Sequence, residues 1–181
     1  IGNNVKIFPN TKIEDNCFIG DNSVIGNNKI NKIKIFNRLK NKILYNKTVI
    51  SKNSIIRSNS VIYNKVFIGE NFISGHNILI RENTHIGKNV VFGSYASSDG
   101  YNTIGSFTHI GQYVMLAQNN EIGKYCFVGG HSHFSNNPYI IQDARYDYFG
   151  SKIKNYVRIG LNCTILSGIT IETNAFIGAK S

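Results

Sequence analysis

Two histidines that stand two residues apart, His131 and His133, open the stretch of the chain that is richest in polar side chains, residues 130–152. A free imidazole has a pKa of about 6.5, so near neutral pH it can remove a proton from an amine or a hydroxyl group. Both histidines are therefore predicted catalytic bases for the transfer of a group to such a nucleophile. The alternative is that both make only structural hydrogen bonds.

The same stretch carries side chains that could bind a polar substrate. The predicted substrate contacts in it are Asn136, Asn137 and Tyr139. A third candidate base, His76, stands beside Asn77, which is also a predicted substrate contact. Both follow Ser74, a polar residue at a position where the repeat described next requires an apolar one. That replacement suggests a site, and an irregular repeat unit that the fold tolerates is an equal alternative.

The elements that would position these residues follow from an apolar residue at every sixth position. The pattern runs through residues 1–25, 50–128 and 159–177, and all but two of its positions hold Ile, Leu, Val or Phe. The two exceptions are Ser74 and Ser98. A period of six is typical of a hexapeptide-repeat solenoid, in which each unit is a short strand followed by a turn.

The turns of such a solenoid require a backbone with positive φ, which asparagine tolerates well. Asn stands three places after the repeated apolar position in many units, as at Asn53 and Asn71. Side chains two places before that position should point inward and be small, and Cys17, Cys126 and Cys163 have this phase. The three cysteines are therefore predicted to be core residues rather than catalytic thiols, metal ligands or disulfide partners.

Three strands per coil would close a triangular prism of about 18 residues per coil, with the coils stacked at about 4.8 Å. Two breaks in the period mark irregular segments, an insertion over about 30–48 and an active-site loop over about 130–152. Apart from these segments, the whole chain, 1–181, is predicted to form a single all-β domain.

The chain has a net charge of +10, and eight of its 20 Lys and Arg residues lie in residues 27–52, which contain no acidic residue. A phosphate-rich partner would suit this segment, and a solvated basic face is the alternative. Nucleic acid is not an expected partner, because no known binding motif accompanies the charge. The sequence contains neither an apolar run of about 18 residues nor a leader with a cleavage site, so a cytoplasmic protein without membrane insertion is expected.

One face of the predicted prism would carry an apolar outward column. The residues that precede positions 56, 74, 92, 110 and 128 are Ile55, Ile73, Val91, His109 and Phe127. An exposed apolar column is typical of a subunit interface, so this face is expected to pack against a neighbour. His76, His109, His131 and the loop at 130 are expected to converge at one edge of the same face.

The whole chain resembles the hexapeptide-repeat acyltransferases, whose fold is a left-handed parallel β-helix. The resemblance, and not the period, implies the handedness, a homotrimer, acetyl-CoA as co-substrate, and no metal. Residues 56–82 look like the N-terminal coils of bacterial sugar-nucleotide N-acetyltransferases. The segment 134–139 keeps the Asn, Pro and Tyr of their nucleotide-sugar motif but not its acidic residue.

Two further segments imply contacts with acetyl-CoA. Residues 104–110 are similar to the unit whose histidine touches acetyl-CoA in amino-sugar N-acetyltransferases, where the catalytic histidine would fall at Gly100. Residues 157–181 resemble the closing coils of such enzymes, which continue into a C-terminal cap, so the chain is expected to be a fragment. The predicted cofactor contacts are His109, Gly111, Gly129, Gly168, Ala179 and Lys180.

The resemblance implies an acetyl-CoA-dependent acetyltransferase that N-acetylates a nucleotide-linked amino sugar for surface polysaccharide or glycan synthesis. Saccharide O-acetylation is the alternative, because residues 130–149 also look like the histidine-bearing loop of O-acetyltransferases with this fold. A γ-type carbonic anhydrase is a remote alternative, since its two histidines five residues apart within the coils are missing. A purely structural prism would carry regular outward threonines, and these are sparse.

Overall fold

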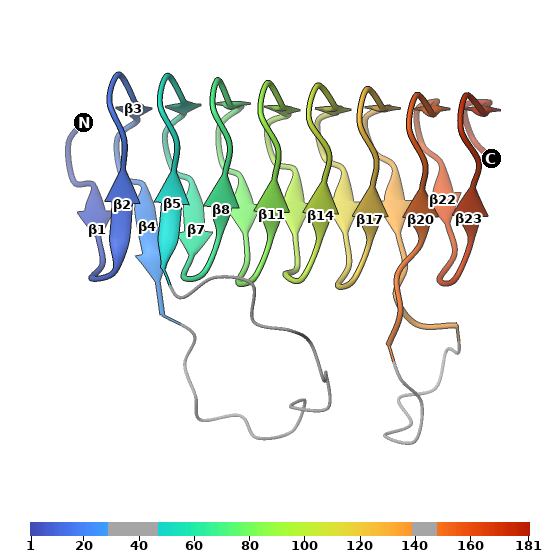
Figure 1. Ribbon diagram of the computed structural model, residues 1–181, viewed down its shortest axis with the longest axis horizontal. Helices are drawn as coiled ribbons and strands as arrows, with labels where there is room; N and C mark the ends of the chain where they lie inside the picture. The colour runs from blue at the N-terminus through green and yellow to red at the C-terminus, as the bar shows by residue number, and fades with distance from the viewer. Residues whose placement is uncertain (29–46, 139–147) are drawn as a thin grey trace.

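The computed structural model describes residues 1–28, 47–138 and 148–181, which form a left-handed parallel β-helix (Figure 1). In these residues, twenty-four short strands make three parallel sheets of eight strands each. Successive strands belong to sheets A, B and C in turn, so each strand pairs with the strand three places later in the chain. The predicted all-β solenoid with three strands per coil is confirmed. None of the described segments is a helix that could span a membrane.

The three sheets take one strand from each coil. Sheet A contains β1 (Lys6–Ile7), β4 (Val24–Asn27), β7 (Val61–Tyr63), β10 (Leu79–Ile80), β13 (Ser97–Ser98), β16 (Met115–Leu116), β19 (His133–Phe134) and β22 (Thr164–Ile165). Sheet B contains β2 (Thr11–Ile13), β5 (Thr48–Ile50), β8 (Phe67–Ile68), β11 (His85–Ile86), β14 (Thr103–Ile104), β17 (Glu121–Ile122), β20 (Lys152–Ile153) and β23 (Thr170–Ile171). Sheet C contains β3 (Phe18–Ile19), β6 (Ile55–Ile56), β9 (Ile73–Ser74), β12 (Val91–Phe92), β15 (His109–Ile110), β18 (Phe127–Val128), β21 (Arg158–Ile159) and β24 (Phe176–Ile177).

The repeated apolar residues fill the interior of the prism. Ile50, Ile68, Ile86 and Ile104 follow one another on sheet B, and each is completely buried. Burial of one such side chain stabilises the fold by about 1.5–3 kcal/mol, so these internal columns are a major source of its stability. The structure also confirms the predicted faces, because positions 56 to 128 share sheet C and positions 50 to 122 share sheet B.

The two serines that interrupt the apolar pattern are buried and hydrogen-bonded. Ser74 Oγ accepts a hydrogen bond from the Arg57 backbone N (3.0 Å) and donates one to the Gly75 carbonyl oxygen (2.9 Å). Ser98 Oγ accepts a hydrogen bond from Asn102 Nδ2 (2.8 Å). Neither serine marks a surface site, because each satisfies its hydroxyl inside the prism.

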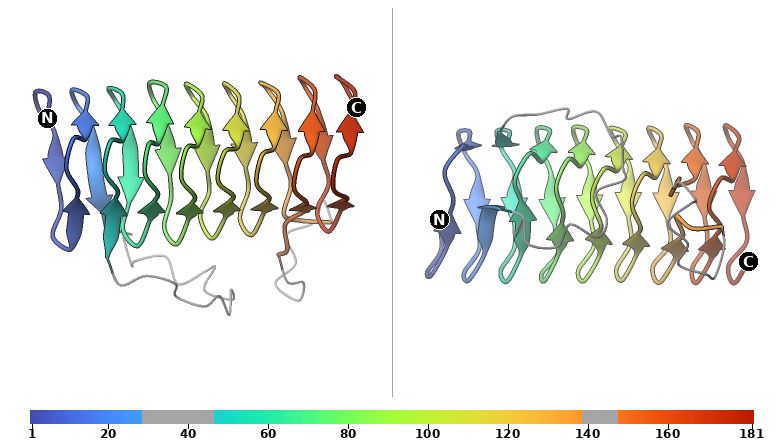
Figure 2. Two further views of the ribbon diagram at one scale, coloured as in Figure 1. Left: turned by 45° about the horizontal axis from the view of Figure 1, so that its top comes forward. Right: turned by 90° about the horizontal axis from the view of Figure 1, so that it is seen from below.

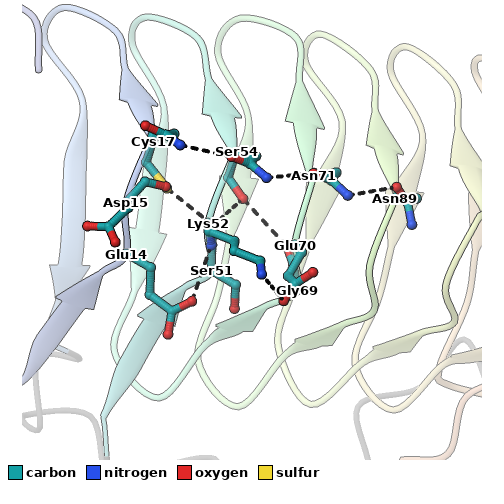
Figure 3. A network of polar contacts seen from close by, with 12 residues as sticks. Glu14, Asp15, Cys17, Ser51, Lys52, Ser54, Gly69, Glu70, Asn71 and Asn89 are labelled. Atoms are coloured by element: carbon teal, nitrogen blue, oxygen red, sulfur yellow. Dashed lines mark hydrogen bonds and ion pairs between the residues drawn. The ribbon is translucent and has the colours of Figure 1, made fainter.

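The turn asparagines adopt the predicted positive φ. At the B–C edge, where sheet B turns into sheet C, Asn53, Asn71 and Asn89 have φ values of 59°, 57° and 54°. Asn53 Nδ2 donates to Asn71 Oδ1 (3.2 Å), and Asn71 Nδ2 donates to Asn89 Oδ1 (3.0 Å). Figure 3 shows this asparagine ladder beside an ion pair between Lys52 and Glu70 (3.5 Å). The ladder ties successive coils together along the edge.

The three cysteines are free, and their position in the repeat predicted that they would be core residues. Cys126 and Cys163 are buried, and Cys17 near the first coil is half-buried. Burial raises the pKa of the Cys126 thiol, which keeps it protonated. The predicted core role is confirmed for the two buried cysteines.

Both breaks in the repeat fall at the A–B edge, where sheet A turns into sheet B. One break lies between β4 and β5, and the other between β19 and β20. The coloured ends of both connections lie on the same side of the prism in Figures 1 and 2. Most of the predicted insertion, 30–48, lies outside the described residues.

The predicted loop over 130–152 is too long at both ends. Residues 130–134 form a regular unit, with His133 exposed in β19 and Phe134 completely buried. The repeat resumes with Ser151 buried and Lys152 in β20. Phe134 stands six residues after Val128 and keeps the phase of the preceding run, whereas the next unit is displaced. The connection therefore leaves from sheet A and not from sheet C.

Candidate functional site

His131 lies on the C–A edge, where sheet C turns into sheet A. Its side chain is exposed, and its backbone has a φ of 60°. Its backbone N donates to the Gln112 carbonyl oxygen (2.8 Å), and the carbonyl oxygen of Gly130 accepts from the Asn162 N (3.0 Å). The coils on both sides therefore fix the backbone from which the imidazole projects.

The imidazole of His131 belongs to a stack of three rings on this edge. The ring centroids of Tyr95 and Tyr113 are 4.8 Å apart with an interplanar angle of 4°. Those of Tyr113 and His131 are 4.7 Å apart with an angle of 17°. We call these three residues the C–A stack. Both tyrosines also have positive φ, at 60° and 57°.

A second stack lies on the B–C edge, where aromatic residues replace the asparagine ladder. Ring centroids are 4.8 Å apart for Phe107 and Tyr125, and 5.0 Å apart for Tyr125 and Tyr156. Sequence reasoning missed both stacks. The signal was present, because these aromatic residues stand three places after the repeated apolar position, where asparagine is otherwise found.

His133 lies on sheet A, in the strand that precedes the second connection. Its Cα is paired with those of Met115 and Thr164, and its side chain is exposed. His131 and His133 thus belong to the same coil, one on the C–A edge and one on sheet A. They are the predicted bases that the structure brings together.

His76 and Asn77 also lie on the C–A edge, but far from His131. Asn77 occupies the same turn position as His131, with Tyr95 and Tyr113 between them. Three steps of about 4.8 Å separate the two positions by about 14 Å. The prediction that three histidines and the loop converge on one edge is therefore wrong, because the second connection leaves from the A–B edge.

His109 projects from sheet C within the predicted apolar column. Its ring lies 5.2 Å from that of Phe127, and partial burial lowers the pKa of His109. The imidazole is therefore neutral near pH 7. Ile55, Ile73 and Phe127 are 37%, 40% and 39% exposed, so the structure confirms an exposed apolar column on sheet C.

Two of the predicted cofactor contacts, Gly111 and Gly129, are required by coil packing. A Cβ on Gly111 would lie 2.6 Å from the Gly130 backbone N. A Cβ on Gly129 would lie 2.5 Å from the carbonyl carbon of Gly160. Close stacking of backbones explains both glycines without a ligand.

Ala179 and Lys180 lie on the C–A edge, two coils beyond His131. Lys180 has a φ of 62°, and its backbone N donates to the Leu161 carbonyl oxygen (2.8 Å). It holds the same turn position as His131 and Asn162, so its Cα is about 10 Å from that of His131 at the coil spacing of about 4.8 Å. The edge thus carries an exposed ammonium group near the candidate base.

Hydrogen bonds hold the two ends of the second connection at the A–B edge. The backbone N of Phe149 donates to the Asn136 carbonyl oxygen (3.1 Å), and Ser167 Oγ donates to the Phe149 carbonyl oxygen (2.6 Å). Gly168 has a φ of 76°, and a Cβ there would lie 2.6 Å from Phe149 Cε2. Gly168 therefore provides the space for the Phe149 ring, on a different edge from the other predicted cofactor contacts.

The remaining predicted substrate contacts, Asn136 and Asn137, lie at the start of this connection. Ser135 Oγ donates to the Asn137 carbonyl oxygen (3.1 Å), which fixes the start of the connection. Tyr139 lies outside the described residues. Within the described ranges, no group of three His, Cys, Asp or Glu side chains could hold a metal ion.

Comparison with known proteins identifies the repeats. The family model "Bacterial transferase hexapeptide (six repeats)" matches residues 1–29, and "Hexapeptide repeat of succinyl-transferase" matches residues 155–181. No curated protein matches the chain. The fold and the repeats define a hexapeptide-repeat protein of the transferase class. The matches at both ends of the chain support a hexapeptide-repeat acyltransferase.

Several solved structures are similar in part. The acetyltransferase domain of PglB from Neisseria gonorrhoeae is 14% identical and aligns with 91% of this chain and 50% of its own, with a TM-score of 0.40. The UDP-N-acetylglucosamine acyltransferase of Arabidopsis is 12% identical over 97% of this chain and 64% of its own, with a TM-score of 0.47. That of Campylobacter jejuni is 18% identical over 94% and 68%, with a TM-score of 0.29. The chain spans between half and about two thirds of the length of these proteins.

Proposed function

We propose that the protein transfers the acetyl group of acetyl-CoA to the amino group of a nucleotide-linked amino sugar, for the synthesis of a surface polysaccharide or glycan. Its superfamily and fold support the reaction class. The observation that carries the proposal is the pair of exposed histidines on one coil, with His131 on the C–A edge and His133 in the strand that leads into the polar connection between β19 and β20. Acetyl-CoA and a nucleotide-linked sugar are phosphorylated metabolites of the cytoplasm, which is where we place the reaction.

The proposed reaction needs a positioned base and two bound substrates. The amine nitrogen attacks the thioester carbonyl carbon, so that a C–N bond forms and the C–S bond breaks. His131 or His133 accepts the proton that the amine loses, and CoA leaves as a thiolate that is then protonated. Alignment of the nucleophile with the carbonyl supplies a further part of the rate enhancement.

The positions of charged and polar side chains suggest how the two substrates would bind. The exposed ammonium group of Lys180 on the C–A edge would bind a phosphate of CoA. The thioester arm would lie along sheet C beside His109, with Gly111 and Gly129 as further proposed contacts. The sugar would contact the start of the connection at Asn136 and Asn137, with Tyr139 and Asn77 as further candidates.

We also propose a cyclic homotrimer that buries the apolar column of sheet C. The outward side chains of β6, β9 and β18 are exposed and apolar, and the neutral His109 lies between them in the column. Because the column repeats at the coil spacing, a second prism of the same period would match it coil by coil.

Acetylation of a saccharide hydroxyl is the second candidate. A hydroxyl group is a weaker nucleophile than a free amine, so its attack depends more strongly on a base. The rigidly placed and exposed imidazole of His131 favours this alternative. The acceptor group therefore has to be determined by experiment.

The first experiment follows the release of free thiol from acetyl-CoA. The panel contains nucleotide-linked 3-amino and 4-amino sugars beside saccharides that offer only hydroxyl groups. The wild-type protein is compared with His131→Ala and His133→Ala, and His76→Ala is the matched control because it is exposed but lies about 14 Å away along the prism. Loss of a general base should lower kcat by about 10²-fold to 10⁴-fold.

The expected result is turnover with an amino sugar that one of the first two variants abolishes and His76→Ala retains. Turnover with hydroxyl acceptors alone would establish the second candidate instead. An absence of thiol release with every acceptor would contradict acetyl transfer.

A further inference from the structure

The C–A stack places aromatic residues where the fold does not require them. The turn position that Tyr113 occupies is held by asparagine in other coils of the same edge, at Asn77 and Asn162, with φ values of 56° and 56°. A residue other than Gly or Asn is disfavoured in this conformation by about 1–2 kcal/mol. Tyr113 is therefore present in spite of its backbone conformation, which points to a role for its side chain.

The stack restrains one ring in particular. His131 is the last of the three rings, and the next residue in the column is the small Asn162. One face of the imidazole lies against Tyr113 at a centroid distance of 4.7 Å. With the backbone of His131 also fixed, the stack limits rotation of the ring about its side-chain bonds.

Stacking uses the face of the imidazole and leaves its edge available. The two ring nitrogens lie in the plane of the ring, so they project away from the stack toward solvent or substrate. A proton can therefore be accepted from a nucleophile while the ring stays in contact with Tyr113. This geometry suits a base that must be oriented before the substrate binds.

We propose that Tyr113 is a positioning residue that orients His131 for proton transfer. The inference rests on the proposed acetyl transfer, and it selects His131 rather than His133 as the base, because no ring stack restrains His133 on sheet A among the described residues. Tyr95 extends the stack by one ring at 4.8 Å and supports Tyr113 from the other side.

The test replaces Tyr113 in two ways. Tyr113→Asn introduces the residue that the same edge already carries at Asn77 and Asn162, so the turn is preserved while the stack is removed. Tyr113→Phe keeps the ring and removes only the hydroxyl. Tyr125→Asn is the matched control, because it removes a ring from the middle of the B–C stack without touching His131.

Two readouts are measured on each variant. The first is kcat and KM for acetyl transfer to the acceptor found in the panel. The second is the NMR shift of the His131 ring protons, assigned by comparison with His131→Ala, which a stacked tyrosine ring displaces upfield. The second readout requires no activity.

We expect Tyr113→Asn to lower kcat by about 10-fold to 100-fold with little change in KM, and to abolish the upfield shift. Tyr113→Phe and Tyr125→Asn should retain both. The double variant Tyr113→Asn, His131→Ala should be no slower than His131→Ala alone, because both changes act through one group.

The unfavourable outcomes separate two failures. A Tyr113→Asn variant with the kcat of the wild type would overturn the positioning role alone. So would a wild-type protein whose His131 ring protons show no upfield shift. A wild-type protein that transfers acetyl to no acceptor would overturn the proposed function and, with it, the catalytic part of this inference.

Discussion

Single residues at the turns decide how the coils stack and what the edges carry. The period of six predicted the turn asparagines and their positive φ, because asparagine is one of the few residues that adopt this conformation readily. It did not predict Tyr113 or Tyr125 at such turns, since an aromatic residue there is disfavoured by about 1–2 kcal/mol. Stacking offsets that energy, and the stacking partners stand 18 or more residues away and become neighbours only in the folded prism.

The predicted role of Gly111 can be separated from its packing role. Gly111→Ala places a Cβ 2.6 Å from the Gly130 N and 2.8 Å from the Val128 carbonyl oxygen, and neither backbone atom can move without displacing the next coil. We expect overpacking to lower the free energy of unfolding by about 1–3 kcal/mol. Urea denaturation followed by circular dichroism measures the change.

Gly130→Ala is the control for this prediction. Gly130 stands on the same edge, but the nearest atom to its added Cβ is the Gln112 carbonyl oxygen at 3.1 Å. It should lose less stability than Gly111→Ala. If Gly111→Ala were as stable as the wild type and bound acetyl-CoA less tightly, direct cofactor contact and not packing would explain this glycine.

The strands were the most predictable elements, and the boundaries of the connections the least. Each strand needs only an apolar residue in phase, so even two-residue strands such as β9 and β13 were found in register with serine at the buried position. The unit at Phe134 is in phase with the preceding run, but it was assigned to the loop because polar residues surround it.

The asparagine ladder provides a prediction at the scale of the edge. Asn71→Ala removes two hydrogen bonds to neighbouring coils and places a Cβ-bearing residue without a compensating side chain at a φ of 57°. We expect a loss of about 1–2 kcal/mol in the free energy of unfolding. Asn71→Gly removes the same hydrogen bonds but adopts positive φ freely, so it should lose less. Equal losses in the two variants, measured by urea denaturation, would assign the effect to the ladder hydrogen bonds instead of the backbone conformation.

For the whole molecule, the phase of the repeat placed some candidate residues on their sheet or edge, but it did not place the site. Phase alone put His109 on sheet C and put His76 and Asn77 on a turn. The convergence of these residues depended on which edge the second connection leaves from, and that edge is determined by the unit at Phe134 in sheet A. Both breaks in the repeat open at the A–B edge, opposite sheet C, so the apolar column of sheet C is flanked only by regular turns (Figure 2).

The proposed trimer leads to a prediction for the assembled molecule. Phe127 is 39% exposed in the apolar column, so Phe127→Lys would place a charge in the proposed interface. We expect the wild type to sediment at three times its chain mass of 20.3 kDa and Phe127→Lys to sediment as a monomer. Thr103→Lys, which introduces the same charge on the exposed face of sheet B, should remain trimeric.

Association of the wild type should also depend on pH through His109. Partial burial already lowers the pKa of this histidine, and burial against a neighbour would lower it further, because desolvation disfavours the charged imidazole. The assembly therefore favours the neutral form, so association should be strongest above the pKa of the free chain and weaken as the pH falls below it. Its closest neighbours in the column, Val91 and Phe127, carry no charge that would stabilise the imidazolium, and Arg158 one coil further on would oppose it. Sedimentation at about pH 8 and about pH 5 should show this weakening in the wild type and not in His109→Gln. A trimer equally stable at both values would place His109 outside the interface.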